Sequence, residues 1–205
     1  MTDLFDTPGL QHVPLPDADL SYAVAPSLGR TPATLLELLH EQTDWRQEDI
    51  VVWGKTHRQP RLHAWYGDPG SHYTYSGIAL QPLPWTPLLL DLKGRLEALS
   101  GTAFNSVLLN YYRDQNDSMG MHSDDEPELG PAPVIASLSL GEVRKLIFRH
   151  RYRRDLEALH LPLAPGSVLL MRGSTQRCWK HGINKQKKPC GPRLNLTFRR
   201  VLASA

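Results

Sequence analysis

The sequence predicts an α+β protein with a mainly β body, and three observations support this fold class. Helical patterns occur only before residue 104, and short β-type runs dominate after it. The 17 prolines and 15 glycines favour short elements joined by turns. The chain has 205 residues and a mass of 23.1 kDa, the size of one globular domain that can bury a sizeable core.

The N-terminal part is expected to contain one short strand and one helix. Residues 1–30 hold four prolines and predict an irregular arm, with a short strand near residues 20–24. Thr31 followed by Pro32 is typical of an N-cap and the first helical position. The leucines that follow extend this predicted helix to about Thr43.

Two strands and a second helix are expected between this first helix and the β body. Residues 50–53 and 62–66 are rich in β-branched and aromatic side chains, which favour strands. A helix fits residues 86–99, because a proline lies near its start and Gly101 follows its end.

Five short runs predict the strands of the β body. Each run is bounded by glycine, proline, asparagine or aspartate, the residues that favour turns. The runs are residues 106–112, 134–140, 145–150, 167–171 and 194–201. Short strands at this spacing are typical of a sandwich or a barrel.

The net charge of +2 conceals an uneven distribution along the chain. Residues 142–200 contain fifteen Lys and Arg against three Asp and Glu, a net charge of +12, and the remainder carries −10. The densest basic runs are residues 144–154 and 185–188. A basic third of this kind indicates a partner with phosphates, although an ordinary solvated surface explains it equally well.

Composition also limits where the protein acts. No apolar run is long enough to span a bilayer, and residues 1–6 lack the pattern of a signal peptide. Cys178 and Cys190 are too few for a disulfide framework and wrongly spaced for a zinc knuckle. We expect a cytoplasmic monomer with reduced thiols that does not contact a membrane.

A His-x-Asp motif offers two ligands for one metal ion. His122 and Asp124 lie two residues apart, so they face the same side of an extended segment. Among the other histidines, His181 is the best candidate for a third ligand because it lies next to a β-type run. Two histidines and a carboxylate form the facial triad of non-haem Fe(II) oxygenases. The motif alone is weak, and ordinary polar roles remain open for these residues.

An alternating segment near the C-terminus offers a site for a small anion. Four polar residues share one face of it, whereas Leu194, Leu196 and Phe198 face the other way. The four are Arg193, Asn195, Thr197 and Arg199. If this face is buried, a dicarboxylate satisfies the two guanidinium groups. The alternative is a polar row that faces solvent.

Two further polar residues precede the His-x-Asp motif. Asn110 and Tyr112 share one face of the predicted strand that leads towards His122. An amide and a phenol at these positions can complete the binding of the same small anion.

The order of these residues resembles the AlkB family of Fe(II)/2-oxoglutarate dioxygenases. The resemblance covers roughly residues 51–201 and is nearest to the branch that repairs alkylated duplex DNA. Further matching stretches include Trp53-Gly54-Lys55, Pro60-Arg61, Tyr66-Gly67-Asp68 and the segment from Tyr73 to Gly77. The combination is specific, although each short motif is not, and residues 1–50 contribute little.

The resemblance implies a fold and a division of the chain. The family fold is a double-stranded β-helix, or jelly roll, with a variable lid that recognises nucleotides. Accordingly, residues 1–50 would form an N-terminal arm and helix, and residues 51–103 a nucleotide-recognition lid and helix. Residues 104–205 would form the catalytic core, within one globular domain overall.

The resemblance also implies cofactors and their ligands. His122, Asp124 and His181 would bind Fe(II). The cosubstrate 2-oxoglutarate would be held at its distal carboxylate by Arg193, with help from Asn195 and Tyr112. The remaining members of the expected cradle are Thr197 and, closer to the metal-chelating end, Asn110 and Arg199.

The implied reaction is the oxidative demethylation of nucleobases in DNA. With O2 and 2-oxoglutarate as cosubstrates, the methyl group of N1-methyladenine or N3-methylcytosine is hydroxylated and released as formaldehyde. Succinate and CO2 are the other products. The implied partner is alkylated nucleic acid, and the branch points to duplex DNA.

Several residues are implied as substrate contacts. Tyr73, Tyr75 and Ser76 fall where the family binds the flipped base, and Asp125 and Glu126 would suit a cationic ring.

Contacts with the rest of the nucleic acid are also implied. Trp53 falls where the duplex-acting branch inserts an apolar wedge. Arg61 and the basic run at residues 149–154 are candidate phosphate contacts. For Trp53 and for the tyrosines of the lid, packing in the protein interior is the competing interpretation.

Three other functions remain open from the sequence. The first is demethylation of RNA or tRNA by the same chemistry, and the second is oxidation of a small molecule or a protein. The third is a non-catalytic nucleic-acid-binding module, which would lack a metal ligand or an arginine of the anion site. No such residue is missing here.

Overall fold

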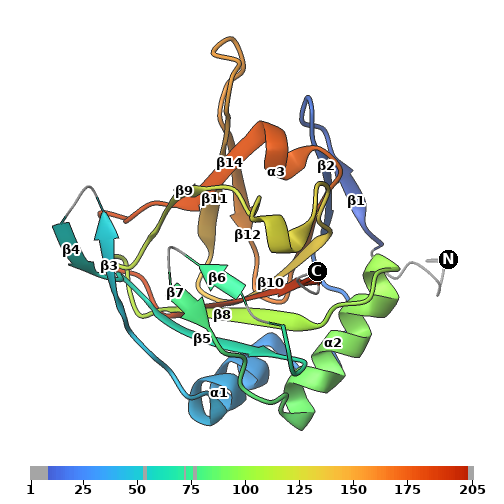
Figure 1. The fold of residues 1–205 in the computed structure, drawn as a ribbon, viewed down its shortest axis with the longest axis vertical. Coiled ribbons are helices and arrows are strands. Elements are labelled where there is room, and N and C mark those ends of the chain that lie inside the picture. The colour runs from blue at the N-terminus through green and yellow to red at the C-terminus, as the bar shows by residue number, and fades with distance from the viewer. Residues whose placement is uncertain (1–8, 53–54, 72, 76–77, 203–205) are drawn as a thin grey trace, which may run out of the picture.

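Two antiparallel β-sheets face one another and form the body of the molecule (Figure 1). The structure is a computed structural model that describes residues 9–52, 55–71, 73–75 and 78–202. The large sheet consists, in spatial order, of β1 (Gln11–Val13), β2 (Asp19–Ala23), β13 (Val168–Arg172), β10 (Ile135–Gly141), β15 (Arg193–Arg199), β8 (Ser106–Tyr112) and β5 (Leu62–Gly67). The small sheet consists of β12 (Leu159–Leu163), β11 (Arg144–His150), β14 (Trp179–Ile183) and β9 (Met119–His122). Two hairpins stand apart from both sheets: β3 (Asp49–Val52) with β4 (Lys55–Arg58), and β6 (Tyr73–Tyr75) with β7 (Ile78–Leu80).

Two long helices cover the outer face of the large sheet. They are α1 (Pro32–Gln42) and α2 (Pro87–Ser100), and Figure 1 shows both on the side away from the small sheet. Thr31 and Thr86 cap them, since each hydroxyl accepts a hydrogen bond from the main-chain nitrogen three residues later. Gly101 ends α2 with a φ of 69°. The predictions of both helices are confirmed. A short 3-10 helix (Pro127–Leu129) and α3 (Thr175–Cys178) complete the helical elements described.

The core has two layers that lie on either side of the large sheet. One layer packs α1 and α2 against the sheet and includes Leu35, Leu92 and Leu196. The other fills the space between the two sheets and includes Phe148 and Trp179. Because it is covered on both faces, all seven residues of β15 are buried. Its polar face therefore points into the protein rather than to solvent.

The predicted strands agree with the large sheet better than with the small one. The run 106–112 coincides with β8, and the runs near β10, β13 and β15 differ from them by only one or two residues at their ends. In the small sheet only β11 was expected, and β9, β12 and β14 were missed. These strands are short and contain Gly120, Pro162 and Gly182, which are disfavoured within strands.

The β body also extends beyond the expected segment 104–205. β1 and β2 pair onto one edge of the large sheet, and β5 forms its other edge. Without these earlier segments, β13 and β8 would be the edge strands and would expose unpaired main-chain groups.

Two further features concern the helices and the two cysteines of the structure. No helix within the described part of the chain is long and apolar enough to cross a membrane. Cys178 and Cys190 are both free thiols.

Candidate active site

The three proposed metal ligands converge at one end of the small sheet. His122 is the last residue of β9, and His181 lies directly opposite it on β14. Their ring centroids are 4.4 Å apart. Asp124 follows β9 by two residues, and one ligand atom from each of the three lies within 4.8 Å of the others. The convergence predicted from the His-x-Asp spacing is therefore observed.

Hydrogen bonds orient two of these ligands. His122 Nδ1 lies 2.9 Å from the carbonyl of Gly120, so it is placed to donate and to leave Nε2 available. The main-chain nitrogen of Asp124 donates to Gln176 Oε1 at 3.0 Å. Asp124 Oδ1 accepts from Arg199 Nη2 at 2.8 Å, whereas Oδ2 is buried without a hydrogen bond among the described residues.

The protonation states of the three residues suit metal binding. Burial alone would raise the pKa of Asp124, but Arg199 and the two histidines outweigh it and hold that pKa at about 2. Burial lowers the pKa of His181 to about 3 and also lowers the pKa of His122. At neutral pH the site thus presents one carboxylate and two neutral imidazoles.

These residues fit an Fe(II) ion by their chemistry. Two imidazoles and one carboxylate form the donor set typical of non-haem Fe(II) oxygenases. The carboxylate oxygen Asp124 Oδ2 is a buried acceptor that a cation would satisfy.

An anion-binding cradle adjoins the metal ligands, between the two sheets. All six residues expected to bind the cosubstrate line one pocket together with the three metal ligands. The six are Asn110, Tyr112, Arg193, Asn195, Thr197 and Arg199. They come from β8 and β15, which are neighbours in the large sheet. Since this face is buried, the alternative of a solvent-exposed polar row is excluded.

Arg193 is the strongest anion-binding group in the cradle. The residue is 1% exposed, and its Nη2 donates to Ser139 Oγ at 2.9 Å. Nε and Nη1 make no hydrogen bond among the described residues, and the guanidinium lies 5.2 Å from the centre of the Tyr112 ring. Burial lowers the pKa of Arg193 to about 10, so it remains charged at neutral pH. A buried charge of this kind requires an anionic partner, and a carboxylate fits it.

The remaining cradle residues are held by neighbouring side chains. Asn195 donates to Ser137 Oγ at 2.8 Å and to the carbonyl of Leu138 at 3.0 Å. Thr197 donates to Asn195 Oδ1 at 3.1 Å. Arg199 differs from Arg193 because its Nη2 holds the carboxylate of Asp124. The two arginines are thus assigned to different ends of the pocket.

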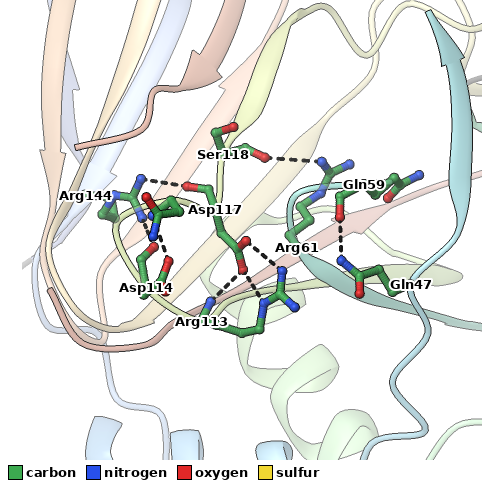
Figure 2. Close-up of polar contacts among 9 residues, drawn as sticks. Gln47, Gln59, Arg61, Arg113, Asp114, Asp117, Ser118 and Arg144 are labelled. Atoms are coloured by element: carbon green, nitrogen blue, oxygen red, sulfur yellow. Dashed lines mark hydrogen bonds and ion pairs between the residues drawn. The ribbon is translucent and has the colours of Figure 1, made fainter. Parts of the chain in front are cut away.

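Arg61 requires a correction. It was expected to contact phosphate, but its side chain is 4% exposed. Its Nε donates to Asn110 Oδ1 at 2.7 Å, and its Nη1 lies 3.4 Å from the carbonyl of Ser118 (Figure 2). Arg61 is therefore a buried group that orients Asn110 and not a surface contact.

Part of the expected basic surface is also engaged within the protein. Arg151 pairs with Asp125, and Arg153 pairs with Asp155 at 2.7 Å and with Asp17 at 3.6 Å. Arg144 is buried. These three arginines are less available to phosphate than the sequence predicted.

The other expected substrate contacts keep the status of predictions. Asp125 is exposed and Glu126 is half-buried, next to the metal ligands in the sequence. Trp53 and Ser76 lie outside the described residues, as do the side chains of Tyr73 and Tyr75.

Sequence reasoning missed several residues that support the site. Gln176 holds Asp124, and Ser137 and Ser139 hold Asn195 and Arg193. The two serines were predictable, because they alternate with leucines in β10 and lie opposite the polar face of β15. Gln176 gave none, since it reaches Asp124 from a helix of only four residues.

Comparison with known proteins identifies the family. The sequence profile of the 2OG-Fe(II) oxygenase superfamily matches residues 29–199. The chain belongs to this superfamily. It is 38% identical over 205 residues to the human DNA oxidative demethylase ALKBH2, covering 95% of this chain and 78% of that protein. The mouse alpha-ketoglutarate-dependent dioxygenase alkB homolog 3 is 43% identical over 175 residues, covering 82% of this chain and 60% of that protein.

Solved structures support the fold. The structure of OsALKBH1 matches with a TM-score of 0.63 and 19% identity, covering 94% of this chain and all of the other. A 2OG-Fe(II) oxygenase family oxidoreductase from Burkholderia pseudomallei matches with a TM-score of 0.59 and 12% identity, covering 90% and 87%. The predicted α+β jelly roll and membership of the AlkB family are confirmed. The protein is an Fe(II)/2-oxoglutarate-dependent dioxygenase that uses O2.

Proposed function

We propose that this enzyme demethylates N1-methyladenine and N3-methylcytosine in DNA and thereby repairs alkylation damage directly. The observation that carries the proposal is the 38% identity over 95% of the chain to a protein named DNA oxidative demethylase ALKBH2. The pocket supports it, because it retains a complete metal triad beside a complete anion cradle. A non-catalytic binding module would not need either.

In this proposal His122, Asp124 and His181 hold Fe(II). Together with 2-oxoglutarate and O2, the bound metal supplies the oxidising power that hydroxylates the N-methyl group. Arg199 keeps Asp124 ionised and holds one of its oxygens, so the carboxylate has a fixed orientation. Gln176 fixes the main chain at the same residue.

The cradle residues would bind and orient 2-oxoglutarate. Arg193 neutralises the distal carboxylate, and Tyr112 and Asn195 lie beside it. Arg199 lies at the end that holds Asp124, and Asn110, which is held by Arg61 and lies opposite Asn195 on β8, would complete the cradle. Because the cradle lies between the two sheets, its burial also excludes water from the reacting end.

The base would enter beside the metal ligands after it leaves the stack. Asp125 and Glu126 would face the cationic ring, and Tyr73 and Tyr75 of β6, together with Ser76, would bind it. Trp53 would occupy the gap in a duplex. Preference for duplex DNA, a monomeric state and a cytoplasmic location are parts of the same proposal.

The outer face of the small sheet supports contact with phosphates. Lys145 and Arg149 of β11 and Lys180 of β14 are exposed, whereas Ile147 between the first two is buried. Arg149 and Lys180 are direct cross-strand partners. Like charges in such a pair are unfavourable unless an anion lies between or above them. This face replaces the internally paired Arg151 and Arg153 as the proposed phosphate contact.

The test is a demethylation assay on an oligonucleotide with one N1-methyladenine, presented as duplex DNA, single-stranded DNA and RNA. We expect a product with the mass of the unmodified base, dependent on 2-oxoglutarate, and fastest with duplex DNA. His122→Ala is expected to abolish the reaction, whereas His160→Ala, at an exposed position of β12, should not.

Three other results of this assay would each refute a different part of the proposal. Succinate formed without loss of the methyl group would retain the oxygenase and refute the nucleobase substrate. A faster reaction with RNA would replace DNA as the substrate. Equal rates with duplex and single strand would refute the duplex preference.

A further inference from the structure

Arg144 is a buried arginine that the active-site pocket does not include. It is the first residue of β11 and is 1% exposed. Its guanidinium donates to three main-chain carbonyls, those of Asp114 at 3.1 Å, Asp117 at 2.9 Å and Asn184 at 2.7 Å. Figure 2 shows the contacts with the segment 113–118. Because a buried charge is costly, this arrangement calls for a specific role.

The three carbonyls belong to the two segments that adjoin the strands of the metal site. Asp114 and Asp117 lie between β8 and β9, shortly before His122. Asn184 directly follows β14, which carries His181. One guanidinium therefore ties the start of β9 to the end of β14.

The small sheet holds the two histidines unequally, because β14 pairs regularly with β11 around His181, whereas His122 lies on the less regularly paired β9. β9 is an edge strand, and it pairs with β14 only at His181 with His122 and at Ile183 with Met119. The register shifts between these two pairs. A regular ladder would set the spacing of the two rings, but a ladder of two interrupted pairs leaves it less defined.

Other hydrogen bonds also hold the segment 113–118: Gln115 O accepts from Gln186 N at 2.9 Å, and Ser118 N donates to Pro60 O at 3.0 Å. A second arginine acts within the segment. The carboxylate of Asp117 accepts from Arg113 N, Nε and Nη2, at 2.9, 2.8 and 2.9 Å. Arg113 is 44% exposed at its side chain and makes these contacts within the segment. It therefore offers a matched control, since its loss loosens the segment without removing the link to β14.

We propose that Arg144 is a positioning residue that holds His122 and His181 at metal-binding distance. It acts through the main chain of the adjoining segments and is not among the residues that line the pocket. Lysine offers a point charge and cannot serve three carbonyls in a fixed plane, and methionine offers no donor. The inference rests on the family of the protein and not on the proposed nucleobase substrate.

A second effect of Arg144 must be separated from this one. Its guanidinium lies 5.8 Å from the centre of the Tyr112 ring, and that of Arg193 lies 5.2 Å from the same ring. The charge of Arg144 can therefore influence the binding of 2-oxoglutarate. Arg144→Lys keeps the charge and removes most of the geometry, so it separates the two effects.

The experiment compares wild type with Arg144→Met, Arg144→Lys and Arg113→Met, without nucleic acid. Co(II) affinity is measured by visible absorption, and amide hydrogen exchange is measured in the metal-free protein. We expect Arg144→Met to weaken Co(II) binding about 10- to 100-fold. Exchange should rise in β9 and at the end of β14. Arg144→Lys should bind Co(II) with intermediate affinity, and Arg113→Met should match the wild type.

The proposal is overturned if both Arg144 variants bind Co(II) with wild-type affinity and spectrum, even if they melt at lower temperature. It is also overturned if Arg144→Met weakens only 2-oxoglutarate binding and Arg144→Lys restores it. If Arg144→Met does not fold, Arg144→Lys decides: unchanged Co(II) affinity and exchange would refute the role. Failure of the demethylase assay would leave these outcomes unaffected.

Discussion

The large and small sheets hold their functional side chains in different ways. β15 pairs with β8 at seven consecutive positions and with β10 at six, without interruption. β14 pairs with β9 at two positions with a shift between them. The residues of the anion cradle thus lie on a regular ladder, whereas the two metal-binding histidines face each other across an irregular one.

The cause of this difference is burial. Helices cover one face of the large sheet and the small sheet covers the other, so apolar packing fixes its main chain. The small sheet presents Lys145, Arg149 and Lys180 to solvent on its outer face. We infer that the fold itself preorganises the anion end, whereas individual polar side chains position the metal end. Loss of one such side chain should therefore affect metal binding selectively.

The largest effect is expected where the two regions meet. Arg199 of the large sheet and Asp124 beside the small sheet form a buried ion pair at 2.8 Å. Arg199→Met leaves the carboxylate buried without its main cation, and we expect the metal-free protein to lose about 3–5 kcal/mol of unfolding free energy. Urea denaturation measures this loss.

Arg113→Met provides the comparison for that measurement, because its partner Asp117 is buried but Arg113 itself is largely exposed. Its loss should cost less, about 1–3 kcal/mol, because Asp117 keeps the hydrogen bond from the main-chain nitrogen of Arg113. Equal losses in the two variants would show that the Arg199–Asp124 pair stabilises the protein no more than the Arg113–Asp117 pair.

A second prediction concerns the large sheet alone. Arg193→Met removes the cation that has no carboxylate partner among its contacts within the described residues. Loss of a buried charge contact costs about 2–5 kcal/mol, so 2-oxoglutarate affinity should fall by roughly two orders of magnitude. Co(II) affinity should stay unchanged, since the ladder remains. Calorimetric titration of the Co(II)-loaded protein with 2-oxoglutarate tests both statements. A parallel loss of Co(II) binding would contradict the separation of the two ends.

The buried histidine His181 should make the unfolding free energy of the metal-free protein depend on pH. His181 has a pKa of about 3 when folded and 6.5 ordinarily, so between these values only the unfolded chain binds the proton. Stability therefore falls as the pH falls from about 6.5 towards 3, by up to about 1.4 kcal/mol per pH unit. The lowered pKa of Asp124 adds a loss in the same direction as the pH approaches 2. His181→Asn should flatten the upper part of this profile, whereas His160→Asn, at an exposed site, should not. Denaturation midpoints from pH 7 to 4 distinguish them.

A smaller effect is expected at Gln176, which accepts the hydrogen bond of the Asp124 main chain. Gln176→Ala removes this acceptor, and Co(II) affinity should fall about tenfold because ligand orientation is lost. Gln176→Glu retains an acceptor and should bind Co(II) more tightly than the alanine variant. Equal affinities for the two variants would show that the contact does not orient the ligand.

The same contrast explains which parts of the fold were predictable. In the large sheet β8 and β15 are seven residues long and lie next to turn residues, so the sequence predicted both. In the small sheet β9 and β14 are four and five residues long, and each contains a glycine. The two strands are far apart in the sequence, so no local sequence pattern predicts that they pair.

The residues of the candidate site also differ in how far the sequence predicted them. The alternation from Arg193 to Arg199 predicted most residues of the anion cradle, and the spacing of His122 and Asp124 predicted two metal ligands. The third ligand, His181, followed from context and from the resemblance. Gln176 and Arg144 were not predictable, because they act through main-chain groups that only the folded chain brings near. Arg61 was misassigned for the same reason, since its partner Asn110 lies on β8, which only the folded sheet places beside β5.

The smallest prediction tests the exposed face of the small sheet. Lys180→Glu converts the like-charged cross-strand pair with Arg149 into one of opposite charge, so stability should rise by about 0.2–1 kcal/mol. Affinity for DNA should fall, and the dependence of binding on salt should weaken by about one to two ions. The two effects have opposite signs, so damage to the fold cannot produce both. Fluorescence anisotropy across a salt series and urea denaturation measure them. If Lys180→Glu stabilises the protein and leaves the salt dependence unchanged, the charges of this face repel each other without serving a phosphate partner.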